Sequence, residues 1–251
     1  MPSRQAEAAM TERVAMIMAG GRSSRMRAGG CSTHKGLRVV GNAPLIEWNV
    51  RTLLSFGFRE LFVAVNAEES ALIEWLNGPG SSIARSLDAT LSVLLERESL
   101  GTVGAVGTLP QNVNEVLVVN VDNLTRMPLD ELARFHRRER AGATIATHRH
   151  PLAVPFGMLE LDGGRVRAYR EKPQLPVAVS SGTYVLGSEA LARVKRGERL
   201  DVPELVQRLL DEGLPVAAFE HEAPWIDVND EAALEKAQQL FAANTLSERP
   251  R

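Results

Sequence analysis

Cysteine is almost absent from the chain, because Cys31 is the only one among 251 residues. A single cysteine excludes an intrachain disulfide and any zinc site built from several cysteines. This scarcity is also typical of proteins that stay in a reducing compartment. We therefore expect a cytoplasmic protein whose fold depends on its core and not on covalent cross-links.

Long apolar runs are missing as well. No stretch approaches the ~18 consecutive apolar residues that a membrane-spanning helix needs. The first thirteen residues, MPSRQAEAAMTER, lack the apolar segment of a secretory signal. The sequence thus predicts neither export nor a membrane partner.

The chain also lacks an excess of charge of one sign, since 29 Lys and Arg stand against 31 Asp and Glu. This balance argues against nucleic acid or an anionic membrane as a bulk electrostatic partner, so any phosphate must bind at a local site. Hydrophobic residues make up 44% and charged residues 24%, which is enough for a sizeable core. The length allows one large domain or two small ones.

Short apolar runs alternate with segments of helical periodicity in the first half of the chain. We predict strands over 14–19, 61–65, 91–95 and 116–121, and helices over 43–56 and 68–76. Continuous β-branched runs are typical of parallel strands covered by helices on both faces. The sequence therefore predicts the α/β class, with a Rossmann-like, mixed but mainly parallel sheet flanked by helices.

The second half has a different pattern, with short strand-like pieces separated by glycines and prolines. We predict strands over 144–147, 156–161, 165–169 and 180–186, and helices over 202–212 and 230–243, the last with Asp230 as its N-cap. We expect this half to be partly antiparallel, to complete the sheet and to enclose a ligand. One domain over 14–243 is the simplest organisation, with disordered ends over 1–13 and 244–251.

The loop after the first strand combines small residues with cations. It reads Gly20-Gly21-Arg22-Ser23-Ser24-Arg25-Met26, and Lys35 follows ten residues after Arg25. Small residues allow close backbone approach, and a guanidinium with an ammonium can neutralise a polyphosphate. The alternative is a glycine-rich turn with solvated charges. Neither G-x-x-x-x-G-K-[ST] nor G-x-G-x-x-G occurs, which disfavours a P-loop NTPase and a dinucleotide dehydrogenase.

Asp122 follows the apolar run VLVVNV directly, at the expected carboxyl end of a central strand. A carboxylate there is costly to hold unless it binds a cation or hydrogen-bond donors, so Asp122 is the best single metal candidate. The alternating histidines His148 and His150 have no evident third ligand, and we interpret them as surface residues.

Several motifs, taken together and in order, resemble those of the sugar-1-phosphate nucleotidyltransferases, whose fold is GT-A-like. The resemblance covers nearly the whole chain and rests on MAGGRSSRM with Lys35, GNAPLIEWNV, ERESLGTVGAV from Glu96, VVNVD, FGMLELDGGRVRAYREKP, SGTYVL and WID. One motif alone is weak evidence, whereas their joint occurrence in order is specific.

The resemblance implies a role for each matching position. Gly20, Gly21, Ser23, Ser24 and Arg25 embrace the nucleotide, and Arg25 and Lys35 neutralise its triphosphate. Further residues line the nucleoside and sugar pocket or meet the sugar and its phosphate: Glu96, Gly101, Thr102, Glu171, Lys172, Gly182 and Thr183. Asp227 is the second carboxylate beside Asp122, and two hard oxygen ligands next to phosphates suit Mg²⁺. The alternatives to these binding roles are purely structural: a turn that begins a helix for Gly101 and Thr102, a hairpin end for Glu171 and Lys172, and a helix cap for Asp227.

The expected reaction is in-line attack of a sugar 1-phosphate oxygen on the α-phosphorus of an NTP, with pyrophosphate as the leaving group. It needs no protein nucleophile. ERESLGTVGAV most resembles guanylyl enzymes, which favours GTP. The expected partners are an NTP and a sugar 1-phosphate, with a homo-oligomer as a further possibility and no nucleic acid. The chain length suggests a stand-alone transferase domain.

Two departures from the family pattern keep alternatives open. Residues 21–26 and His34-Lys35-Gly36 look more like molybdenum cofactor guanylyltransferases, whose acceptor is a molybdopterin phosphate. Val121 stands where the family usually has glycine before the metal Asp, and its side chain is expected to crowd the nucleotide. Val121 and Gly36 therefore motivate a second alternative, a catalytically silent regulatory subunit that keeps the nucleotide pocket.

Overall fold

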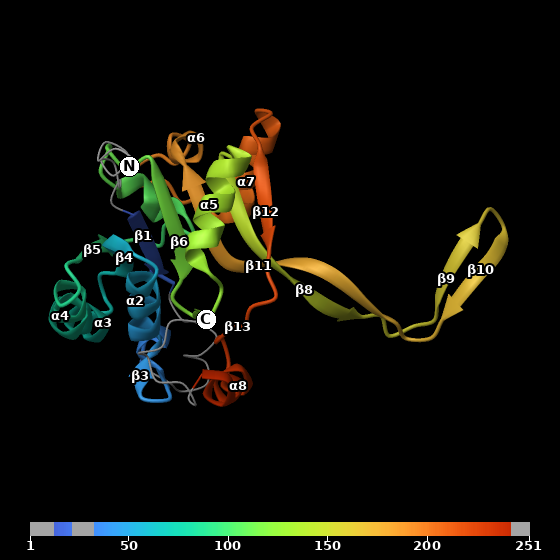
Figure 1. Ribbon diagram of the computed structural model, residues 1–251, viewed down its shortest axis with the longest axis horizontal. Coiled ribbons are helices and arrows are strands. Elements are labelled where there is room, and N and C mark those ends of the chain that lie inside the picture. The colour runs from blue at the N-terminus through green and yellow to red at the C-terminus, as the bar shows by residue number, and fades with distance from the viewer. Residues whose placement is uncertain (1–12, 22–32, 242–251) are drawn as a thin grey trace, which may run out of the picture.

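The computed structural model of the protein describes residues 13–21 and 33–241. Its centre is a seven-stranded sheet flanked by helices (Figure 1). In spatial order the strands are β12 (Val216–Glu220), β8 (Ala143–Ala153), β11 (Gln174–Gly187), β6 (Glu115–Asn120), β1 (Arg13–Ala19), β4 (Phe58–Asn66) and β5 (Thr90–Glu96). Only β11 runs against its neighbours β6 and β8, while the other pairs are parallel. The predicted α/β class with a mainly parallel sheet is confirmed.

The apolar runs are continuous because the central strands are buried on both faces. In β1, Ala15 and Ile17 belong to one core cluster, while Met16 and Met18 belong to the cluster on the other face. Successive side chains of a strand point to opposite faces, so a strand between two helical layers must be apolar throughout.

The helices divide between the two faces of the sheet. The first face holds α2 (Leu45–Ser55), α3 (Ser70–Trp75), the π-turn η2 (Leu76–Gly80), α4 (Ser81–Arg85) and α5 (Leu129–Glu139). The second face holds η3 (Gly104–Thr108), α6 (Ser188–Leu191) and α7 (Val202–Asp211). None of the helices in the described part of the chain is long and apolar enough to cross a membrane.

A third, smaller cluster lies below the sheet in Figure 1 and includes the last helix, α8 (Glu231–Phe241). Phe241 packs edge-on against Trp48 with ring centroids 6.1 Å apart. The predicted N-cap of α8 is confirmed, since Asp230 Oδ1 accepts a hydrogen bond from the Ala233 N–H at 2.7 Å. The cluster also contains the short pairs β2 (Val39–Val40) with β3 (Ala43–Pro44), and β7 (Asn123–Thr125) with β13 (Trp225–Asp227).

The second half completes the sheet with β11, β8 and β12, as expected, and its enclosure of a ligand stays a prediction. The outer parts of β8 and β11 continue beyond the sheet as a two-stranded ribbon, which carries the hairpin β9 (Met158–Asp162) and β10 (Arg165–Arg170) at its end (Figure 1). β11 is irregular between Ser180 and Tyr184, where Gly182 has φ +66°. A bulge of this kind bends a strand, so the ribbon leaves the body at this point.

Candidate active site

The predicted site residues with described positions come mainly from one edge of the sheet, where the parallel strands end. Gly20 follows β1, Glu96 ends β5, Asp122 follows β6 and Asp227 ends β13. Two backbone hydrogen bonds tie these ends together, from Val121 N–H to the Met18 carbonyl at 3.1 Å and from Val228 N–H to the Asp122 carbonyl at 2.9 Å. The carboxyl ends of parallel strands are where α/β proteins bind ligands.

Lys35 and Asp122 form the central contact of this edge. Lys35 Nζ lies 2.5 Å from Asp122 Oδ2, and the two side chains are 19% and 13% exposed. Lys35 opens the short helix η1 (Lys35–Leu37). The buried His34 fixes that helix, because its Nε2 lies 3.0 Å from the Ala19 carbonyl and its Nδ1 accepts the Gly36 N–H at 3.0 Å. The predicted cation and the predicted metal ligand are thus brought together by a histidine that sequence reasoning did not single out.

Asp227 is the second carboxylate of the group. Its Oδ2 accepts a hydrogen bond from Asn229 at 3.2 Å, while its Oδ1 is buried and has no hydrogen-bond partner in the described part of the chain. Burial, and after it the negative charge of Asp122, raises the pKa of Asp227 to about 6, against a smaller lowering by Lys35. Among the described residues, the negative charge of Asp122 thus opposes ionisation of Asp227 more than Lys35 favours it.

This donor set fits a magnesium ion. Mg²⁺ takes oxygen ligands and is usually held by one or two carboxylates together with substrate phosphates and water. Asp122 and Asp227 would supply the carboxylates, and the unpaired Asp227 Oδ1 is an oxygen that a cation would satisfy. No group of three or more His, Cys, Asp or Glu suited to a metal occurs among residues 13–21 and 33–241.

Glu96 lies at the end of β5, next to the start of the glycine loop. It is buried, and neither carboxylate oxygen has a hydrogen-bond partner among the described residues. Burial raises the pKa of Glu96. A Cβ added at Gly20 would lie 1.8 Å from Glu96 Oε2, so the absence of a side chain at Gly20 makes room for this carboxylate.

Comparison with known proteins identifies the family. The family model named nucleotidyl transferase matches residues 14–244. The chain belongs to the nucleotidyl transferase family. The mannose-1-phosphate guanylyltransferase catalytic subunit beta of Xenopus tropicalis is 26% identical over 222 residues, which are 85% of this chain and 60% of that protein. The chain thus spans about 60% of the length of this curated relative.

Solved nucleotidyl transferase structures share the fold. A protein of Bacillus anthracis, named provisionally as a glucose-1-phosphate thymidylyltransferase, superposes with a TM-score of 0.73 at 19% identity, over 94% of this chain and 98% of that one. HddC from Yersinia pseudotuberculosis, solved with GMP-PN, superposes with a TM-score of 0.68 at 19% identity, over 91% of this chain and 99% of that one. At such identities these likenesses establish the fold.

Gly36 and Val121, which come from the two departures from the family pattern, lie next to each other in the structure. A Cβ added at Gly36 would lie 2.9 Å from Val121 Cγ2, and Val121 is fully buried. The space that a side chain at position 36 would need is therefore filled by the valine. The Val121 side chain packs into the protein beside Gly36, and its effect on the nucleotide stays a prediction.

Gly101 and Thr102 fasten the loop after β5 to helix α7. Gly101 has φ +79°, and a Cβ there would lie 2.5 Å from the Leu200 carbonyl oxygen. Thr102 N–H donates to Asp201 Oδ1 at 2.8 Å, and Thr102 Oγ1 accepts the Val202 N–H at 2.9 Å. These reciprocal bonds satisfy donors at the start of α7. The structure gives both residues a positioning role, and their contact with a ligand stays a prediction.

Gly182 and Thr183 lie where β11 passes the site. A Cβ added at Gly182 would lie 2.2 Å from Asn123 Nδ2. The Asn123 side chain and the Trp225 indole N–H both donate to the Ser181 carbonyl at 2.7 Å. Asn123 and Trp225 thus tie β7 and β13, and with them the two site carboxylates, to the main sheet. Sequence reasoning missed these roles, although both residues stand within the VVNVDN and WID segments.

Within one chain, Glu171 and Lys172 do not lie at the carboxyl edge of the sheet. They lie between β10 and β11, on the projecting ribbon, and Tyr169 Oη donates to Glu171 Oε2 at 2.8 Å. β11 is extended from Gln174 onward, so Lys172 is about 30 Å along the ribbon from Thr183. Ser23, Ser24 and Arg25 lie outside the described residues.

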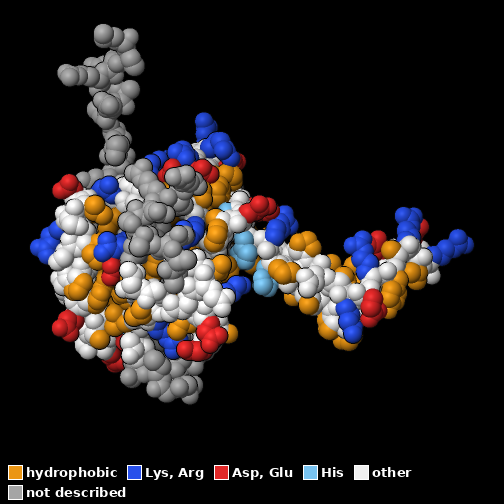
Figure 2. Space-filling model, turned by 60° about the horizontal axis from the view of Figure 1, so that its bottom comes forward, with side chains coloured by type: hydrophobic (Ala, Val, Ile, Leu, Met, Phe, Trp, Pro, Cys, Tyr) orange, Lys and Arg blue, Asp and Glu red, His pale blue; other side chains and the backbone are white. Residues whose placement is uncertain are grey.

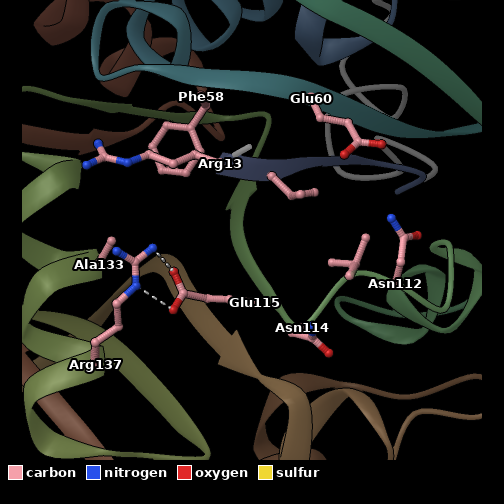
Figure 3. A pocket seen from close by; sticks show the side chains of 10 residues that line it. Arg13, Phe58, Glu60, Asn112, Asn114, Glu115, Ala133 and Arg137 are labelled. Atoms are coloured by element: carbon pink, nitrogen blue, oxygen red, sulfur yellow. Dashed lines mark hydrogen bonds and ion pairs between the residues drawn. The ribbon is translucent and has the colours of Figure 1, made fainter. Parts of the chain in front are cut away.

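A cavity of about 440 Å³ opens at the opposite edge of the sheet. Its lining includes Arg13, Glu60, Asn112, Glu115 and Arg137, from the amino ends of β1 and β6 and from neighbouring segments (Figure 3). Arg137 binds Glu115 through two hydrogen bonds of 2.9 and 2.7 Å. None of the predicted site residues lines this cavity.

The histidines also differ from expectation. His150 is exposed, but His148 is half-buried, with its ring 4.3 Å from the Trp225 ring and 6.1 Å from the His221 ring. Burial and a neighbouring histidine lower the pKa of both His148 and His221. His148 therefore packs around β13 while remaining partly exposed at the surface.

Proposed function

We propose that the protein transfers a nucleotidyl group from an NTP, with GTP favoured, to a sugar 1-phosphate. The products are a nucleotide sugar and pyrophosphate. The observation that carries the proposal is the Lys35–Asp122 pair with Asp227 beside it, at the carboxyl edge of a nucleotidyl transferase fold. The naming of a relative as a mannose-1-phosphate guanylyltransferase supports guanine and a sugar phosphate, and the GMP-PN bound to HddC supports guanine.

The chain's own residues position charge and do not form covalent intermediates. The attacking phosphate oxygen is already an anion, so no side chain is needed as a general base. The Lys35 ammonium holds Asp122 in place and adds positive charge at the edge where the NTP phosphates bind. Gly20 and the exposed Gly21 have no side chains, so those phosphates can come close to the backbone there.

Asp122 and Asp227 would hold Mg²⁺, which supplies charge neutralisation at the reacting phosphates when bound. Asp227 would have to lose its proton for the metal to bind, since only the ionised carboxylate is a strong ligand. Arg25 is proposed to share the triphosphate charge with Lys35. We further propose that residues 14–243 act as one transferase domain in the cytoplasm.

The test is pyrophosphate release from the purified protein with Mg²⁺, over a matrix of four NTPs and mannose, glucose and heptose 1-phosphates. Release that needs one NTP together with one sugar phosphate, and that is lost in Asp122→Ala, supports the proposal. Glu115→Gln is the matched control, because Glu115 also pairs with a cation but lies at the opposite edge. NTP binding by calorimetry without release from any well would instead favour a molybdopterin acceptor or the silent subunit.

A further inference from the structure

The projecting ribbon has no core of its own. We call residues 148–180 the arm; it comprises the outer parts of β8 and β11 and the hairpin of β9 and β10 (Figure 1). No residue of the arm is buried. An isolated two-stranded ribbon is at best marginally stable in water, so the arm needs a surface to pack on.

The arm also concentrates the apolar surface of the molecule. Figure 2 shows hydrophobic side chains along it, with Lys and Arg gathered toward its far end. Among the described residues, eleven large hydrophobic side chains are exposed, and six of them are on the arm: Leu152, Phe156, Leu159, Leu161, Val166 and Tyr169. Phe156 is 73% exposed. Contiguous apolar surface of this kind is typical of an interaction site.

The charges of the arm and of the candidate active site are complementary. Lys172 makes no ion pair with any described residue. At the site, Lys35 contacts Asp122, and Asp227 Oδ1 has no hydrogen-bond partner among the described residues. Two phosphate esters brought together there would add further negative charge, so a further cation at this edge would favour the reaction.

The arm begins beside the site. Ser181, the residue that follows the arm, accepts hydrogen bonds through its carbonyl from Asn123 and Trp225, the neighbours of the two carboxylates. Lys172 lies about 30 Å out along the arm, so a two-fold axis near the middle of two antiparallel arms places the Lys172 of each copy at the root of the other arm, beside the other site. A closed pair of this kind covers both arms with identical contacts.

We propose that two copies of the chain exchange arms, so that the arm of one copy lies across the active site of the other and delivers Glu171 and Lys172 to it. Each site is then composite, with Lys35, Asp122 and Asp227 from one copy and Lys172 from the second. The catalytic part of this inference rests on the proposed function, whereas the exchange of arms does not.

The first test is the oligomeric state, measured by sedimentation equilibrium. We expect a dimer for the wild-type protein and a monomer for Leu161→Asp/Val166→Asp, whose two changes lie on the hairpin of the arm. Leu87→Asp/Leu210→Asp, at exposed apolar positions on the body, is the matched control and should remain dimeric. Circular dichroism checks that each variant is folded. A monomeric wild-type protein, or a dimer that the arm variant leaves intact, overturns the proposal.

The second test is complementation between two inactive variants. Asp122→Asn and Lys172→Met are each expected to lose activity alone. In a mixed dimer, the Lys172→Met copy has an intact carboxylate site and receives an intact arm from the other copy. Random pairing of equal amounts then restores about a quarter of wild-type activity, since about half of the dimers are mixed and each has one complete site. Absence of any recovery means that Lys172 acts within its own chain or not at all, and overturns the composite site.

The third test does not need turnover. Glu171→p-benzoylphenylalanine places a photo-cross-linker on the arm, and ¹⁵N-labelled and unlabelled copies distinguish cross-links between chains. We expect cross-links between chains to peptides that contain residues 120–127 or 225–229. If these form while no nucleotide and sugar phosphate react, the proposed function fails and the arm exchange stands. Cross-links confined to one chain, or to a different surface, refute the exchange.

Discussion

Lys35 Nζ and Asp122 Oδ2, which are 87 residues apart in the sequence, lie 2.5 Å apart at the carboxyl edge of the sheet. Both side chains are largely but not fully shielded from water. Because the charge of each group holds the other in place, removal of one is expected to displace the other as well. The contact therefore links the cation expected to meet the triphosphate with the carboxylate expected to hold the metal.

The first prediction concerns this pair. Lys35→Ala and Asp122→Asn should each lower kcat at least about 100-fold, the usual effect of removing one preorganised charged group from a transfer site. The double variant should be little worse than either single one, since the two groups act as a unit. Steady-state pyrophosphate release measures this. Multiplicative losses in the double variant would show that the two residues act independently.

Asp227 provides a prediction on stability and pH. Its carboxyl has a pKa of about 6 in the folded protein, above its ordinary value of 3.8. Between these values the folded state binds more protons than the unfolded state, so the free energy of unfolding falls as pH rises through this window. Asp227→Asn removes that cost and should raise stability in metal-free buffer by on the order of 2 kcal/mol above pH 6.

The gain from Asp227→Asn should shrink as the pH is lowered toward 4, while activity is lost at every pH. Urea unfolding at pH 4.5, 6 and 8 measures it. Asp211→Asn is the control, because Asp211 is an exposed carboxylate that accepts a hydrogen bond from Gln207 away from the site. A gain that is the same at all three pH values, or a loss of stability at pH 8, would contradict a pKa of Asp227 raised by burial and by the charge of Asp122.

The sheet could be predicted because burial on both faces leaves a direct mark on the sequence. β1 and β6 are apolar at every position that packs against a helix, and so their runs are unbroken. The arm left a weaker mark. The strands predicted over 156–161 and 165–169 correspond to β9 and β10, whereas only the inner ends of β8 and β11 were predicted, because their outer parts face solvent on both sides.

Asp122 could be proposed as a site residue from the sequence, because a carboxylate directly after an apolar strand needs a cation or hydrogen-bond donors. His34, Asn123 and Trp225 were missed because their roles depend on partners far along the chain: the Ala19 carbonyl for the first and the Ser181 carbonyl for the other two. Likewise Val121 and Gly36 look like two separate defects in the sequence, and only their contact in space shows that each accommodates the other.

That contact can be tested with a double-mutant cycle. Gly36→Ala should be destabilising, since its Cβ would lie 2.9 Å from Val121 Cγ2 and 3.1 Å from His34 Nδ1. Val121→Ala alone should cost about 1–2 kcal/mol through lost burial. Together the two changes should cost less than the sum, by about 0.5–2 kcal/mol, because the alanine at 121 frees space for the one at 36. Strictly additive free energies of unfolding would show that the residues do not share this space.

Substitutions at Gly20 and Gly21, at the end of β1, should separate effects on stability from effects on NTP affinity. Gly20→Ala would place a Cβ 1.8 Å from Glu96 Oε2, so the buried carboxylate must move, at a cost of about 1–3 kcal/mol. Gly20→Ala/Glu96→Ala should regain stability without regaining NTP affinity, because Glu96 is proposed to line the nucleoside pocket. Gly21→Ala is the matched control for the fold, since a Cβ there meets no atom of the described residues within 4 Å. We expect this variant to unfold like the wild type and yet to bind the NTP more weakly in calorimetry, because the added methyl group blocks the close approach of phosphate to the backbone. Wild-type NTP affinity in Gly21→Ala would place the triphosphate away from this loop.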